Sequence, residues 1–120
     1  MIILKPIRED QLSEPEQIDL ITLVNGEHNV TIAFQLFQSY DGQAYLISES
    51  STVTIEIGSN DRQPLSISGT INSSNHSIIT ATLTDVQIRK IRTGYVKIIM
   101  ELPNGSKRIA YESNVIEKIG

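Results

Sequence analysis

The sequence has no cysteine and no tryptophan, and its 120 residues include only four tyrosines and two phenylalanines. Without cysteine, neither a disulfide framework nor a thiolate metal site is available, so the fold must rest on a hydrophobic core. A chain of this length can bury one such core as a single domain. The redox compartment is left open by the same absence.

Long hydrophobic runs are also absent. No apolar stretch approaches the roughly 20 residues that a membrane helix requires, and the start MIILKPIRED lacks the apolar region and cleavage site of a secretory signal peptide. We therefore expect a soluble protein that does not bind a membrane and is not exported by the signal-peptide route.

Isoleucine, valine and threonine are abundant, which favours strands over helices. Apolar and polar residues alternate in segments that recur about every 8 to 15 residues, with glycine, asparagine, aspartate and serine between them. This pattern predicts a mainly β sandwich, with residues 44–48 as a brief strand or an irregular crossing segment. The predicted strands are 18–24, 30–37, 52–57, 65–71, 78–83, 95–102 and 107–111.

The stretch TDVQIRKIRTGYVKIIMELPNGSKRIAYE predicts one short helix that leads into a hairpin. Thr84 and Gln87 have the spacing of a capping box, and Gly94 ends the helix. The Asn-Gly pair at 104–105 lies between two alternating segments, which is the strongest short-range signal of a β-hairpin. The returning strand could extend through residues 114–119 past a kink at Ser113-Asn114.

The charges are divided unequally along the chain. Residues 1–60 hold two basic and nine acidic residues, a net charge of −7, and residues 61–120 hold eight basic and five acidic residues, a net charge of +3. Either the two halves interleave in the sandwich and mix their charges, or acidic and basic faces meet between neighbouring copies. The basic residues lack interleaved stacking aromatics, so we expect no nucleic-acid binding.

Residues 1–16 combine an apolar head with an acidic tail that contains two prolines. Two interpretations are open: a first edge strand followed by a loop, or an extended arm that docks on another subunit by strand addition or pocket insertion. We predict an N-terminal arm over 1–16 and a sandwich domain over 17–120. The arm would be anchored by its three apolar residues, Ile2, Ile3 and Leu4.

No residue pattern indicates catalysis, a cofactor or a metal. The chain has no Gly-x-Ser-x-Gly elbow and no phosphate-binding glycine loop. Its two histidines, His28 and His76, lie in polar loops without a second ligand at metal spacing. Neither Asp41-Gly42 nor Asn60-Asp61 has the closely spaced acids of a calcium loop, so both are interpreted as turns. The paired carboxylates of glycoside hydrolysis are defined by their spacing in space, and Glu49, Glu56 and Glu101 could each be proposed for such a pair, but all three are expected to face water.

Tyr40 and Tyr45 bracket the Asp41-Gly42 turn. Aromatic faces in a binding loop stack on sugars, so this pair is a candidate glycan platform. Packing in the core or at a sheet edge is the alternative for both side chains.

Four segments resemble the immunoglobulin-like N-terminal domain of bacteriophage baseplate upper proteins and similar small Ig-like virion domains. They are VTIAFQLFQSYDGQAYLI, TVTIEIG, LTDVQIRKI and GYVKIIMELPNGSKRIAYESNVIEKI. The resemblance covers about residues 17–120 and implies an Ig-like antiparallel β-sandwich. It also implies a non-enzymatic structural component of a tailed-phage virion, made in the host cytoplasm.

Several expectations about partners follow from this resemblance. The baseplate proteins continue beyond the domain, so a small adaptor of the baseplate, tail or neck, or a capsid decoration protein, is expected. Its partners would be other virion proteins and further copies of itself, in a trimer or hexamer. The arm residues would anchor it, and Arg89, Lys90 and Arg92 would supply charged docking contacts. The alternative is a carbohydrate-binding module that recognises a host glycan through Tyr40 and Tyr45.

Overall fold

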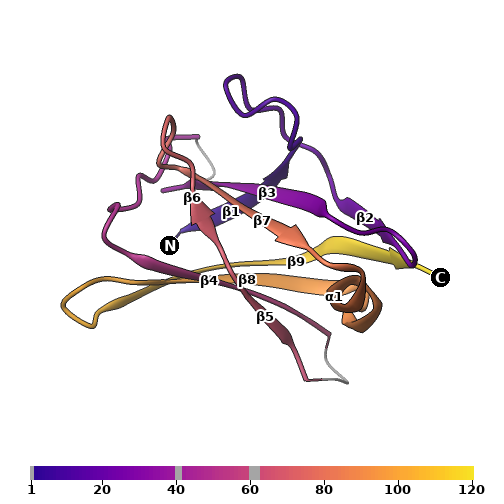
Figure 1. The fold of residues 1–120 in the computed structure, drawn as a ribbon. Coiled ribbons are helices and arrows are strands. Elements are labelled where there is room, and N and C mark those ends of the chain that lie inside the picture. Colours follow the sequence, from indigo (N-terminus) through magenta and orange to yellow (C-terminus); the bar gives the residue numbers. More distant parts are fainter. Residues whose placement is uncertain (1, 40–41, 60–62) are drawn as a thin grey trace.

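The computed structural model describes residues 2–39, 42–59 and 63–120. These residues form two β-sheets packed as a sandwich, with one short helix beside them (Figure 1). The predicted mainly β sandwich, with one short helix before the C-terminal hairpin, is thereby confirmed. The strands are β1 (Ile3–Ile7), β2 (Ile21–Val24), β3 (Val30–Phe37), β4 (Thr52–Gly58), β5 (Leu65–Ser68), β6 (Thr70–Ile71), β7 (Ile78–Leu83), β8 (Gly94–Glu101) and β9 (Lys107–Ile119), and the helix is α1 (Asp85–Lys90).

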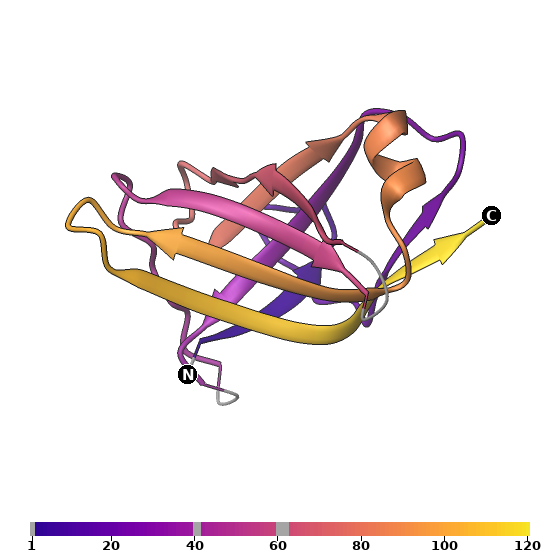
Figure 2. The ribbon, with the colours of Figure 1, turned by 90° about the horizontal axis from the view of Figure 1, so that it is seen from below.

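The described strands divide into a four-stranded sheet with the order β1-β3-β7-β6 and a five-stranded sheet with the order β2-β9-β8-β4-β5. Neighbouring strands are antiparallel except for β2, which runs parallel to β9. Figure 2 shows β4, β8 and β9 side by side as one layer, with β3 crossing behind them. The two sheets therefore bury their facing sides against each other.

The core follows the period of two that the sequence shows. In β4 the inward residues Val53, Ile55 and Ile57 are at most 4% exposed. The same alternation buries Ile32, Phe34 and Leu36 in β3 and Val96, Ile98 and Met100 in β8. Phe34 of β3 is the largest side chain that is fully buried. Burying an aliphatic or phenyl side chain of this size contributes about 1.5–3 kcal/mol, so these strands supply much of the stability of the fold.

The first strand corrects the expectation of a free arm. Residues Ile3–Ile7 pair antiparallel with β3, and Ile3 and Leu4 are 4% and 0% exposed in the core of their own chain. The apolar head is buried here because removing it from water is favourable wherever a core is within reach. Pro6 fits an edge strand, where one missing amide donor is tolerated. The sandwich therefore begins at β1, before residue 17, and the edge-strand interpretation describes this segment.

Among the described strands the chain crosses from one sheet to the other five times, after β1, β2, β3, β5 and β7. The crossing after β5 leads directly into β6. The single strand predicted over 65–71 is wrong, because Gly69 separates it into these two pieces. A Cβ at Gly69 would lie 2.8 Å from Ile79 Cγ2 and 3.0 Å from Val53 Cγ1, so only glycine fits this crossing without displacing the core.

The hairpin between β8 and β9 is confirmed. Leu102 N donates to Ser106 O at 2.8 Å, and Gly105 has the positive φ (+88°) that the turn requires. Asn114 also has a positive φ (59°), and β9 continues past it to Ile119. The returning strand therefore extends beyond the predicted kink, and the register of β8 and β9 shifts between Gly94 and Val96 at this irregularity.

Candidate functional site

Helix α1 begins at the capping box that the sequence predicts. Gln87 N donates to Thr84 Oγ1 at 3.2 Å, and Thr84 N donates to Gln87 Oε1 at 2.9 Å. Ile88 is fully buried against the core and fixes the rotation of the helix. Arg89 and Lys90 therefore stand exposed in its last turn.

An open groove of about 580 Å³ lies between the end of α1 and the segment that leads into β5. We call it the basic groove, because the charged side chains that line it are all basic among the residues that the structure describes. The structure thus brings together the three bases predicted as docking residues. The described lining residues are Gln63, Pro64, Leu65, Arg89, Lys90 and Arg92.

Two cationic side chains near this groove, Arg92 and Lys118, donate hydrogen bonds to backbone carbonyl oxygens at the C-terminal end of the helix. Arg92 Nη1 donates to Arg89 O at 3.0 Å and to Ile91 O at 3.1 Å. Lys118 Nζ, from β9, donates to Ile88 O at 2.5 Å and to Ile91 O at 3.2 Å. Burial, and then the positive charge of Arg92, lower the pKa of Lys118. Arg92 and Lys118 thus lie close enough for the charge of one to act on the other.

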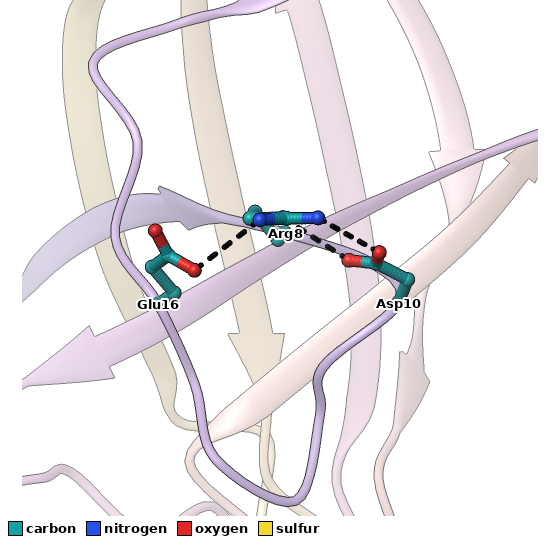
Figure 3. Close-up of polar contacts among 3 residues, drawn as sticks. All are labelled: Arg8, Asp10 and Glu16. Carbon is teal, nitrogen blue, oxygen red and sulfur yellow. Dashed lines mark hydrogen bonds and ion pairs between the residues drawn. The ribbon is translucent and has the colours of Figure 1, made fainter.

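The segment from Arg8 to Glu16, which we call the acidic loop, leaves the sandwich after β1 and is closed by its one base (Figure 3). Arg8 Nε and Nη2 donate to both carboxylate oxygens of Asp10 at 3.2 and 2.9 Å, and Arg8 Nη1 donates to Glu16 Oε2 at 3.4 Å. Asp10 first, and then Glu16, raise the pKa of Arg8. All three side chains are exposed, so these pairs shape the loop more than they stabilise the fold.

The acidic loop is attached to the outer side of the four-stranded sheet. Arg8 N donates to Glu16 O at 3.0 Å, which joins the two ends of the loop. Leu12 packs against a small second cluster of buried residues, formed by Ile7, Ala33 and Ile78. The loop is therefore held in place at its base and through Leu12.

Two further acids of the loop, Glu9 and Glu14, are exposed, and neither forms an ion pair within the part of the chain that the structure describes. With Asp10 and Glu16 they outnumber Arg8 four to one, so residues 8–16 have a formal charge of −3. The loop therefore presents a compact, negatively charged surface to solvent.

The outer side of the five-stranded sheet has an aromatic pair, which we call the tyrosine face. The ring centroids of Tyr95 and Tyr111 are 5.3 Å apart, and Tyr111 is 54% exposed. Tyr95 Oη donates to Glu56 Oε2 at 3.0 Å. Burial, followed by the hydrogen bond and charge of Glu56, raises the pKa of Tyr95. The ring of Tyr95 also lies where a Cβ of residue 58 would be, so Gly58 makes room for it.

The predicted glycan platform is not brought together by the described residues. Tyr40 and Asp41 lie outside them, and Tyr45 is half-buried and packs against the main core. Residues 44–48 are the irregular crossing segment, with a single bridge between Ala44 and Phe37. For Tyr45 the packing alternative describes the structure.

The other residues weighed from the sequence lie apart. His76 Nε2 is 3.1 Å from Glu49 Oε1, His28 is exposed in its loop, and Glu101 faces Lys107 across the hairpin. Within residues 2–39, 42–59 and 63–120, no three histidine, aspartate or glutamate side chains gather in a way that would hold a metal ion. Asn60 and Asp61 are outside the described residues.

Sequence reasoning missed the tyrosine face, although its signal was present. The alternation of β8 places Tyr95 outward, and the Asn-Gly turn sets a register in which Tyr111 faces Lys97. In that register Tyr95, which lies two residues before Lys97 on the same face, is the diagonal neighbour of Tyr111. The sequence did not predict the groove itself, because no local sequence pattern indicates that the segment before β5 lies opposite α1.

No protein-family model matches the chain, and no curated protein matches its sequence. Within the described residues, none of the helical structure is long and apolar enough to cross a membrane. A functional proposal therefore rests on the geometry of the three surfaces and on the resemblance of residues 17–120.

Proposed function

We propose that the chain is a non-enzymatic structural component of a tailed-phage particle, built on an Ig-like sandwich. In Ig domains, strands A, B, E and D form one sheet and C, F and G the other. The strand orders β1-β3-β7-β6 and β9-β8-β4 correspond to A-B-E-D and G-F-C when β2 and β5 are taken as additions to the second sheet. This strand order is the observation that carries the proposal, together with the resemblance to Ig-like virion domains.

In this proposal the docking surfaces are the acidic loop and the basic groove, and they replace the N-terminal arm that the sequence predicted. Of the outer strands, β2 and β5 have four residues each, β6 has two, and β1 contains Pro6. Short edges and edge prolines resist pairing with another chain. The acidic loop and the basic groove offer charged side chains instead of backbone pairing, and contacts of this kind gain strength when many copies bind one particle.

The proposal is tested on particles released by the strain that encodes the chain. Quantitative mass spectrometry across a density gradient should find the protein at a constant ratio to the major capsid protein, and an antibody should label one location in the particle. A protein that is abundant in the lysate but absent from the particle fractions would refute the virion role. A host cytoplasmic protein measured in the same fractions controls for contamination.

The tyrosine face favours a second candidate function, binding of a host glycan. Tyr111 is exposed beside Tyr95, and Glu56 and Lys97 supply hydrogen-bonding groups in the same cross-strand row as Tyr111. Sugars bind through such a combination of ring stacking and polar contacts. A glycan-array signal that Tyr111→Ala abolishes and Leu46→Ala retains would support this function, since Leu46 is an exposed apolar residue elsewhere. An array without any signal would refute it.

A further inference from the structure

We propose that the acidic loop of one copy docks into the basic groove of the next copy, so that the chain assembles head to tail. The two surfaces have opposite formal charges, −3 for residues 8–16 and +3 for the three bases that line the groove. The inference concerns contacts between copies, and it stands whether or not the chain belongs to a phage particle.

Only some of the basic side chains at the groove form hydrogen bonds with the carbonyls of α1. Arg92 and Lys118 bind the helix carbonyls, and the other two cations at this end of the helix, within the described residues, are Arg89 and Lys90. Arg89 and Lys90 are exposed and form no ion pair with any carboxylate in the described part of the chain. Their charges are therefore available to a partner.

The loop has the matching properties of a docking element. Arg8 fixes its shape through Asp10 and Glu16, and Leu12 attaches it to the sheet. A segment ordered in advance loses less conformational entropy on binding than a flexible arm. Glu9 and Glu14 are then left to make contacts outside the molecule.

One copy cannot use its own loop to fill its own groove. The loop packs on the outer side of the four-stranded sheet, whereas the groove lies between α1 and the start of β5, the edge strand of the other sheet. In Figure 1 the loop is the indigo segment above β1, and α1 and β5 lie at the lower right. A contact between two different surfaces is heterologous, and it forms a ring if the rotation closes and a filament if it does not.

The experiment uses two charge-reversed variants of the whole chain, because a truncation of residues 1–16 would remove β1 from the sandwich. The loop variant is Glu9→Lys with Glu14→Lys, and the groove variant is Arg89→Glu with Lys90→Glu. We expect the wild type to associate in light scattering and sedimentation at low ionic strength. Each variant alone should associate at least about tenfold more weakly, since like charges then meet at the contact.

Mixing the two variants gives the decisive measurement. The groove variant retains its acidic loop and the loop variant retains its basic groove, so one native contact is available only in the mixture. We expect the two variants to associate in the mixture much more strongly than either does alone. Their association also demonstrates that both variants are folded. A mixture of folded variants, checked by circular dichroism, that stays monomeric while the wild type associates would overturn the proposal.

The matched control for the groove variant is Lys107→Glu with Arg108→Glu, which makes the same change in charge on the exposed β8–β9 hairpin. It should associate as the wild type does. The wild-type association should also fall with salt, because the screening length shortens from about 10 Å at 0.1 M to about 3 Å at 1 M. A wild type that is monomeric at low salt up to about 1 mM protein, which covers weak charged contacts, would likewise overturn the proposal.

Discussion

The substitution Leu4→Ala tests whether the N-terminal apolar segment is a strand of the core or an arm that docks on another subunit. Leu4 is fully buried between the sheets, and it faces Leu36 in the pairing of β1 with β3. Truncating a buried leucine to alanine loses the transfer free energy of three carbons and leaves a cavity, at a cost of roughly 2.7–5.0 kcal/mol. The sandwich should therefore lose about 3 kcal/mol of its free energy of unfolding, a large share of the roughly 5–15 kcal/mol that is typical of a domain.

The assay is urea unfolding followed by circular dichroism, with Leu46→Ala as the matched control. Leu46 is 68% exposed, so the same truncation there should change the free energy of unfolding by less than about 0.5 kcal/mol. For a domain of this size the loss at Leu4 corresponds to a fall in Tm of roughly 12 °C. An anchor for another subunit would give the opposite result: a variant that unfolds like the wild type while its association is lost.

Three further outcomes are expected. Gly94→Ala should destabilise the fold by about 1–3 kcal/mol or more in urea unfolding, because a Cβ there would lie 1.9 Å from Gly58 O, and a variant of wild-type stability would contradict the close approach. Thr84→Ala should cost about 1 kcal/mol through loss of the capping box, measured in the same way. Absorbance titration should place the ionisation of Tyr95 above pH 10.0, and Glu56→Gln should bring it back toward that value. Because the folded pKa of this tyrosine is the higher one, its contribution to stability is present below pH 10.0 and is lost as the pH rises through the folded pKa.

Local chemistry explains which features the sequence could predict. The alternation of Val53, Ile55 and Ile57, the box at Thr84 and Gln87, and the Asn-Gly turn all depend on residues within a few positions of one another. Their structures follow from side-chain periodicity, one pair of hydrogen bonds and one favourable backbone conformation. Each of these features is present in the structure.

Features that depend on distant residues were not predictable in this way. Whether Leu4 is an arm or a strand depends on the free edge of β3, which is more than twenty residues away in the sequence. The break at Gly69 depends on Ile79 and Val53 of two other strands. The same holds for the candidate sites: the bases at the end of α1 were predicted as docking residues, but the groove also needs the segment before β5.

The unequal division of charge along the sequence is explained by where the charged residues lie in the structure. The sequence left two interpretations open: acidic and basic residues mix on one sandwich, or acidic and basic faces meet between copies. Within the sheets the charges are mixed, since Glu56 faces Lys97 and Glu101 faces Lys107 in neighbouring strands. The excess of each sign is found outside the sheets, in the acidic loop and beside α1. Charges there do not compete with the packing of the core, so they can be concentrated without lowering its stability. A contact between such surfaces selects a second copy by charge while the strand edges stay unpaired, which is why we expect salt and charge reversal to control the assembly.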